Sequence, residues 1–191
     1  MSNRNPFQLL KKRREMVNRR ELRSIIASKE LELAVDLGCG PSPRNKYRAQ
    51  RVIGFDRDSN PSSGVQALDL SCERLPLADG AANLVTAFDV LEHIPRWERR
   101  GGRVVYPFID LMNEIYRVLT PGGFFYSETP AYPHSEAFQD PTHINILTER
   151  TLPDYFCAPK NWAGSYGFEG SFTMLRQFWR RGHLIALLTR K

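Results

Sequence analysis

The chain has 191 residues, of which 41% are hydrophobic and 25% are charged, and its formal net charge is +6. This composition is that of an ordinary globular domain, and it excludes a disordered chain, a collagen or a coiled coil as a description of the whole. No stretch approaches the roughly 18 to 20 consecutive apolar residues of a membrane span, and the charged N-terminus lacks the apolar region of a secretory signal. We therefore predict a soluble, cytoplasmic protein without a transmembrane segment.

The positive charge is concentrated at the N-terminus. Residues 1–30 contain nine basic and three acidic residues, whereas residues 31–191 contain 18 of each and are neutral. Apolar residues also recur in residues 1–30 often enough for one helix face to pack on the rest of the protein. We predict a basic helical arm over residues 1–30 and a single domain over residues 31–191. Such an arm could instead bind the phosphates of nucleic acid or an anionic membrane surface.

The three cysteines are Cys39, Cys72 and Cys157. Their odd number, wide spacing and lack of histidine partners at metal-ligand intervals indicate neither a disulfide framework nor a zinc site. The histidines and carboxylates elsewhere in the chain match no strong metal signature. We therefore predict no bound metal.

Short apolar runs predict the strands of a central sheet. They are Leu33–Leu37, Arg51–Phe55, Val65–Leu70, Ala82–Phe88 and Gly123–Ser127. Continuous apolar runs of this kind are typical of parallel strands that are covered on both faces. Apolar residues at spacings of three and four predict an amphipathic helix over Tyr106–Leu119, and a short helix is predicted over Thr151–Phe156.

The C-terminal residues predict a different arrangement. Ser171–Trp179 and His183–Thr189 flank Arg180–Gly182, which indicates an antiparallel hairpin. The whole pattern predicts an α/β fold with a mostly parallel central sheet, a C-terminal antiparallel hairpin at its edge and helices on both faces.

Glycines and acids follow the predicted strands, at the edge where open parallel sheets bind ligands. The first strand ends in Asp36-Leu-Gly-Cys-Gly40, the second in Asp56 and the third in Asp69-Leu70. Glycines let the backbone approach a ligand, and a carboxylate can accept hydrogen bonds from both hydroxyls of a ribose. A dinucleotide site needs a third glycine that opens a helix, whereas Pro41-Ser-Pro43 follows here.

These motifs resemble, in order and spacing, those of class I S-adenosylmethionine-dependent methyltransferases. The resemblance covers roughly residues 33–130 and rests on Val35–Gly40, Gly54–Asp56, Asp69-Leu70 with Leu75–Leu77, Phe88–Pro95 and Glu114–Gly123. It implies a Rossmann-like fold, S-adenosyl-L-methionine as the cofactor and S-adenosyl-L-homocysteine as the product. Only thirteen residues separate Gly40 from Gly54, so we expect the first helix of the family to be short or absent.

The resemblance also implies which residues hold the cofactor. By position these are Asp36, Gly38, Cys39, Gly40, Asp56, Arg57, Asp69, Leu70, Ala87 and Phe88. The first loop would hold the methionine end, Asp56 the ribose, and Asp69 with Leu70 the adenine. Ala87 and Phe88 would line the sulfonium side. Because the first helix is reduced, Arg44 and Lys46 are candidates for the contact with the cofactor's carboxylate.

Residues 129–145, residues 162–170 and the final hairpin resemble a methyltransferase type 11/12-like subgroup of bacterial and phage proteins that often occur with surface-polysaccharide genes. The candidate general bases after the fifth strand, and not this subgroup resemblance, lead us to expect O-methylation of a small-molecule or glycan hydroxyl by in-line displacement. The alternative is a methyltransferase or binding protein that acts on nucleic acid through the basic arm. A chain of this length leaves no room for a separate substrate-binding domain. A second subunit of a homo-oligomer could therefore contribute residues to the acceptor site.

A hydroxyl acceptor benefits from a general base, and histidine titrates in the suitable range. His134, Asp140 and His143 follow the fifth strand, and we predict His143 or His134 as the base, oriented by Asp140. The same residues could instead satisfy the backbone of a tight turn. Tyr132 and His93 are the predicted acceptor contacts, although His93 could also have a structural role.

Overall fold

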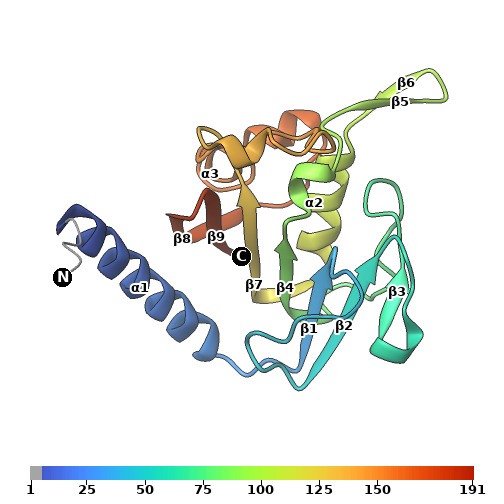
Figure 1. The fold of residues 1–191 in the computed structure, drawn as a ribbon. Coiled ribbons are helices and arrows are strands. Elements are labelled where there is room, and N and C mark those ends of the chain that lie inside the picture. The colour runs from blue at the N-terminus through green and yellow to red at the C-terminus, as the bar shows by residue number, and fades with distance from the viewer. Residues whose placement is uncertain (1–5) are drawn as a thin grey trace.

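The computed structural model describes residues 6–191, and their side chains from residue 17 onward. A seven-stranded sheet forms its centre (Figure 1). The strands of this sheet are β1 (Leu33–Leu37), β2 (Arg51–Asp56), β3 (Val65–Ala67), β4 (Ala82–Phe88), β7 (Leu119–Pro130), β8 (Phe172–Arg180) and β9 (His183–Arg190).

The sheet is mostly parallel. Its order is β3-β2-β1-β4-β7-β9-β8. Neighbouring strands from β3 to β7 pair in parallel, whereas β9 is antiparallel to both β7 and β8. The predicted α/β class, the parallel centre and the antiparallel C-terminal hairpin at the sheet edge are confirmed.

Two strands differ in length from the prediction by more than one residue. β3 ends at Ala67 rather than Leu70. The chain turns there because Asp69 accepts hydrogen bonds from both the backbone N–H and the hydroxyl of Ser71. β7 is longer than predicted, since it pairs with β4 on one side and with β9 on the other.

Helices cover both faces of the sheet, as predicted. α2 (Pro107–Val118) and the short α3 (Thr151–Tyr155) lie on one face, and α1 (Pro6–Ala27) lies against the other, beside β8 (Figure 1). α2 starts with proline at its first position, where the missing N–H costs no helical hydrogen bond. Residues 38–50 contain no helix, which confirms the expected loss of the first family helix.

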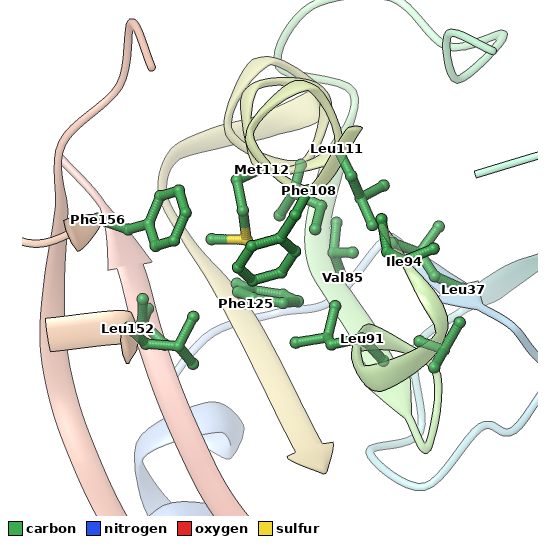
Figure 2. Packing of buried hydrophobic residues seen from close by; sticks show 14 of the residues in the cluster. Leu37, Val85, Leu91, Ile94, Phe108, Leu111, Met112, Phe125, Leu152 and Phe156 are labelled. Carbon is green, nitrogen blue, oxygen red and sulfur yellow. The ribbon is translucent and has the colours of Figure 1, made fainter. Parts of the chain in front are cut away.

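Each face of the sheet buries its own hydrophobic cluster. On the α2 face, Met112 points toward Val85 and Phe125 of the sheet (Figure 2). On the α1 face, Ile26 packs in a cluster with Leu84. The neighbours Leu84 and Val85 belong to different clusters because successive side chains of a strand point to opposite faces.

A small second sheet is not among the predicted elements. β5 (Glu98–Arg100) and β6 (Arg103–Val105) form an antiparallel hairpin. Its turn contains Gly101 and Gly102, with φ of 54° and 79°, and such values favour glycine. The paired glycines are a turn signal, but the charged residues around them lack the apolar alternation that marks a strand.

α1 covers most of the predicted basic arm at residues 1–30. Residues 1–5, which include Arg4, lie outside the described part of the chain. Leu22 and Ile26 are buried at the sheet, so the C-terminal part of α1 packs on the domain. The division into arm and domain stays a prediction. Every helix within residues 6–191 is too short or too polar to cross a membrane.

We expect Phe125→Ala to lower the free energy of unfolding by about 3 to 5 kcal/mol, because it leaves a cavity between α2 and β7. Phe125 is 0% exposed, whereas Val104 on β6 is 48% exposed. Val104→Ala is therefore the control, with an expected effect within about 0.5 kcal/mol. Urea unfolding followed by circular dichroism measures both. Equal effects of the two substitutions would contradict this description of the core.

Candidate active site

A cavity of about 660 Å³ opens at the carboxyl ends of β1, β2 and β4. Its lining residues are Gly38, Asp56, Arg57, Leu68, Asp69, Leu70, Ser71, Asp89, Val90, His93, Ile94, Pro95, Pro141, Thr142 and Ile144. Small-molecule and cofactor pockets typically measure about 300 to 1,000 Å³. The cavity therefore has a suitable size, and it lies at the sheet edge where the sequence predicts the cofactor.

The glycines after β1 allow the backbone to follow the wall of the cavity. Gly38 has φ of +60°, and a Cβ there would lie 2.5 Å from Cγ2 of Val90. Gly40 has φ of +66°, but open space surrounds the position of its Cβ. Both positions favour glycine through their backbone conformation, and Gly38 is also confined by a neighbour.

Asp56 ends β2 with its carboxylate oriented by two backbone donors. Its Oδ2 accepts a hydrogen bond from the N–H of Gly40 at 2.8 Å, and its Oδ1 accepts one from the N–H of Arg57 at 2.8 Å. Each carboxylate oxygen can accept a further hydrogen bond. The oriented Asp56 side chain therefore keeps the capacity to bind the two hydroxyls of a ribose.

The adenine-binding residues predicted after β3 also lie on the cavity. Asp69 accepts hydrogen bonds from the Ser71 hydroxyl at 2.7 Å and the Ser71 N–H at 2.9 Å. The hydroxyl bond, followed by the backbone bond, lowers the pKa of Asp69. Leu68 and Leu70 add apolar surface beside this carboxylate. An ionised acceptor next to an apolar wall suits a flat ring that carries an amino group.

Asp36 and Cys39 are buried and do not line the cavity. Asp36 accepts hydrogen bonds from the hydroxyl of Thr86 at 2.6 Å and from the N–H of Arg44 at 2.8 Å. Burial raises the pKa of Asp36, and these two bonds oppose the rise. Burial also raises the pKa of the Cys39 thiol to about 11. Asp36 thus orders the loop after β1 through its hydrogen bond with the N–H of Arg44. Cys39 is a protonated residue that packs in the protein interior.

The residues predicted for the sulfonium side lie outside the cavity lining. Ala87 belongs to the cluster on the α2 face, and Phe88 belongs to the cluster on the α1 face. Arg44 and Lys46 place their charged groups 5.0 Å and 3.7 Å from the centroid of the Phe88 ring, which is a cation–π arrangement. The cofactor roles of these four residues stay predictions.

A smaller cavity of about 180 Å³ lies between α1 and the sheet. Arg19 and Arg23 of α1 line it together with Lys46 and Arg180. Glu128 also lines it and forms an ion pair with Arg180. Two arginines of the predicted arm therefore contribute to a cationic pocket.

Three predicted residues meet at the rim of the larger cavity. His93, in the 3-10 helix Leu91–His93, packs edge-on against His143 with 4.9 Å between the ring centroids. Asp140 places Oδ2 4.0 Å from Nε2 of His143. Asp140 also accepts hydrogen bonds from the hydroxyl and the N–H of Thr142 at 2.7 and 2.8 Å, and these bonds lower the pKa of Asp140. Asp140 therefore forms a tight turn and lies beside His143.

Asn145 attaches this loop to the 3-10 helix. Asn145 is fully buried, and its N–H donates to the carbonyl of Glu92 at 2.9 Å. Its side-chain amide donates to the carbonyl of Leu91 at 3.0 Å, and Arg96 Nε donates to its Oδ1 at 2.7 Å. These bonds join segments that lie about fifty residues apart in the sequence.

His134 and Tyr132 lie apart from the histidine pair. The ring of His134 packs on Trp179 of β8 with 4.8 Å between centroids. Tyr132 is 55% exposed and packs edge-on against Phe138. Of the five predicted acceptor-side residues, His93 lines the larger cavity, and His143 and Asp140 lie next to it through their contacts rather than in the lining. His134 and Tyr132 lie apart from this group.

Two acids after β4 are missing from the predicted site residues. Asp89 lines the cavity, has φ of 55° and places Oδ1 3.1 Å from Nε2 of His183. Glu92 is 1% exposed, and burial raises its pKa to about 8. Their position at the end of a strand was the signal that could have identified them.

The comparisons with known proteins agree with this geometry. Residues 35–127 match the family model of the methyltransferase domain. A probable S-adenosylmethionine-dependent methyltransferase from Mycolicibacterium smegmatis is 34% identical over 89 residues, which are 43% of this chain. The matched part spans only 30% of that relative's length.

Solved structures show the same fold. PH0226 protein from Pyrococcus horikoshii has a TM-score of 0.60 and 14% identity, with 94% of this chain and 91% of that chain covered. The N-methyltransferase NodS from Bradyrhizobium japonicum, solved with S-adenosyl-L-homocysteine, has a TM-score of 0.57 and 12% identity. That alignment covers 98% of this chain and 89% of NodS. At these identities the likeness concerns the fold alone.

The residues of the larger cavity fit S-adenosylmethionine. A Cβ at Gly38 would collide with Val90, so only bare backbone fits there. The carboxylate of Asp56 is oriented by backbone donors, and Asp69 lies beside apolar Leu70 on the same cavity. Sheet order, cavity and family model lead to the same assignment. The family-model match over residues 35–127, together with the sheet order and the cavity, supports a class I S-adenosylmethionine-dependent methyltransferase.

Proposed function

We propose that this chain binds S-adenosyl-L-methionine in the larger cavity and methylates a hydroxyl group of a small molecule or glycan. The observation that carries the proposal is the placement of two kinds of residue around one cavity. Asp56 and Asp69 line it on the side of β2 and β3, and His93 lines it on the side of β4. Cofactor-binding and acceptor-binding groups therefore share one space.

The cofactor side of the cavity binds by shape and by hydrogen-bond acceptors. In this proposal the backbone at Gly38 contacts the methionine end, Asp56 binds the ribose and Asp69 with Leu70 binds the adenine. When bound, S-adenosyl-L-methionine would supply a methyl group on a sulfonium, and in-line attack of a nucleophile on that methyl carbon would release S-adenosyl-L-homocysteine. The protein has to orient the two reactants and exclude water.

The acceptor side contains a histidine in a suitable tautomer. Nδ1 of His143 lies 3.3 Å from the carbonyl of Ala137. A carbonyl can only accept, so Nδ1 carries a proton, and in the neutral ring the lone pair is on Nε2. Asp140 lies 4.0 Å from Nε2 and positions the loop through Thr142. We propose that His143 is the general base that takes the proton of the acceptor hydroxyl. Asp140 is its positioning residue.

The smaller cavity bears on the choice of acceptor. Arg19, Arg23 and Lys46 surround a volume of about 180 Å³, which suits a single anionic group rather than a polynucleotide strand. We therefore favour a small-molecule or glycan acceptor over nucleic acid bound at this pocket. The alternative of nucleic acid bound along the arm remains an outcome of the labelling experiment below.

We expect Asp56→Ala to weaken S-adenosyl-L-methionine binding by roughly tenfold to a hundredfold, because hydrogen bonds to a charged group contribute about 1.5 to 3 kcal/mol. Asp58→Ala is the control, since Asp58 is exposed and outside the cavity lining. Isothermal titration calorimetry measures both variants after a thermal unfolding scan confirms their folding. An unchanged Kd for folded Asp56→Ala would contradict the ribose assignment.

The two glycines after β1 provide a matched pair. Gly38→Ala introduces both an unfavourable φ and a collision with Val90, whereas Gly40→Ala introduces only the unfavourable φ. We expect Gly40→Ala to cost about 1 to 2 kcal/mol of stability and Gly38→Ala to cost more. Thermal unfolding ranks the stability of the two variants. Equal losses would show that the Val90 side chain moves away from the new Cβ without a measurable loss of stability.

Methyl transfer can be followed with S-adenosyl-L-methionine that carries a labelled methyl group. Acceptor fractions from cells that lack the protein would be separated into small molecules, glycans and nucleic acid. We expect label in the first or second fraction, and label confined to nucleic acid would overturn the proposal. His143→Ala should then lower kcat by about 10² to 10⁴ without changing cofactor Kd. A loss caused by His134→Ala instead would identify the other predicted base.

A further inference from the structure

Glu92 carries a buried carboxylate without a bonding partner. The residue is 1% exposed, and neither Oε1 nor Oε2 has a hydrogen-bond partner. A carboxylate removed from water is costly unless it is hydrogen-bonded, paired with a charge or bound to a metal. An unsatisfied buried group in a native protein therefore indicates a missing partner, such as a water molecule or an ion.

Two histidines lie beside this carboxylate. One potential ligand atom from each of Glu92, His93 and His143 lies within 4.8 Å of the other two. Nδ1 of His93 lies 3.2 Å from the carbonyl of Thr142, and Nδ1 of His143 lies 3.3 Å from the carbonyl of Ala137. In the neutral form of each ring, these contacts place the proton on Nδ1 and the lone pair on Nε2. Metal-binding histidines are commonly oriented by such a bond from the other ring nitrogen.

We propose that Glu92, His93 and His143 bind one divalent transition-metal ion at the rim of the cofactor cavity. One carboxylate and two imidazoles form a donor set that suits Zn²⁺ and other first-row metals. Ligand atoms around one Zn²⁺ lie roughly 3 to 3.5 Å apart, given bonds of about 2 Å. The three side chains must therefore move together by small rotations when the ion binds.

The charges around the cluster favour a cation. Asp89 and Asp140 are the neighbours whose charges act on Glu92, and both are acidic. They create a negative potential at a position where the Glu92 carboxylate has no cationic partner. A divalent ion would compensate the charges of Asp89 and Asp140, and it would bind Glu92 as a carboxylate by displacing any proton on it.

The fold holds the three ligands in place from two distant segments. Glu92 and His93 belong to the 3-10 helix after β4, and His143 belongs to the loop after β7. Asn145 bonds to the carbonyls of Leu91 and Glu92, and Asp140 forms the turn before His143. Rigid supports of this kind favour metal binding, because the ligands are brought near each other before the ion arrives.

Three protein ligands leave a coordination position for a further ligand. His93 and Thr142 line the cavity, so this position lies at the acceptor side. If the proposed function holds, an acceptor hydroxyl bound there would have a lowered pKa, as for metal-bound water. In the metal-bound form His143 would be a ligand of the ion and not the general base, and the ion would take over activation of the acceptor hydroxyl. The metal site itself does not depend on that function.

Calorimetric titration of the full chain with ZnCl₂, after chelator treatment and dialysis, tests the site. We expect one Zn²⁺ per chain, and at least tenfold weaker binding in both His143→Ala and Glu92→Gln. His134→Ala is the matched control, because this imidazole packs on Trp179 outside the cluster. Cys72→Ser is the second control, since its exposed thiol is another potential zinc ligand. Both controls should keep native affinity.

Cobalt gives an independent readout that does not require activity. Co²⁺ bound by two nitrogens and a carboxylate should give visible absorption bands, and these bands should disappear in His143→Ala. A circular dichroism spectrum identifies any variant that fails to fold, and His93→Ala then replaces Glu92→Gln. Absence of saturable binding, unchanged binding in folded His143→Ala, or loss in Cys72→Ser would each overturn the proposal.

The failure of this proposal is distinguishable from failure of the proposed function. S-adenosyl-L-methionine can be titrated into the chelator-treated protein in the same calorimeter. Cofactor binding without zinc binding would overturn the metal site and leave the methyltransferase assignment intact. Zinc binding without cofactor binding would support the metal site and contradict the proposed function.

Discussion

Two carboxylates hold the connection between β1 and β2, and the shape of the cofactor cavity depends on them. The carboxylate of Asp36 on β1 accepts a hydrogen bond from the N–H of Arg44. The carboxylate of Asp56 at the end of β2 accepts one from the N–H of Gly40. Residues 38–50 form no helix, so helical hydrogen bonds cannot order this loop. Side-chain acceptors replace them. The same acid that would bind the ribose therefore also shapes the loop beside it.

The two faces of the sheet have different roles because successive side chains alternate. The face under α2 carries the larger hydrophobic cluster and supports the 3-10 helix after β4 through residues such as Leu91 (Figure 2). The opposite face carries α1 and the cationic pocket. Phe88 illustrates the consequence. Phe88 ends β4, the strand that leads to the cavity, but its ring lies on the α1 face and makes a cation–π contact with Lys46.

The rim of the cavity joins the methyltransferase core to the loop after β7. Asn145 makes this junction by bonding to the carbonyls of the 3-10 helix. It brings His143 against His93 and closes the cavity with Thr142 and Ile144. The loop that closes this end of the cavity lies outside the matched family domain, which ends at residue 127. In the proposed function, differences in this loop would change the acceptor while leaving the cofactor side intact.

The sequence could predict those features that depend on local pattern. The strands Leu33–Leu37 and Ala82–Phe88 have the predicted bounds, because their apolar runs are continuous and end in turn residues. The missing first helix follows from the short Pro-containing connection. The cofactor positions Asp56 and Asp69 also lie on the cavity as predicted, since the end of each parallel strand reaches the same sheet edge.

Tertiary structure alone decided the direction of side chains and the meeting of distant segments. Ala87 and Phe88 are adjacent to the site in sequence, yet they point into the two hydrophobic clusters. Glu92 is recognisable as an acid, but its burial without a partner depends on packing from other elements. The choice between His134 and His143 likewise required the fold. Sequence alone determined where the strands of the central sheet lie and which acids follow them, because these are local properties, whereas the rim cluster arises from contacts about fifty residues apart.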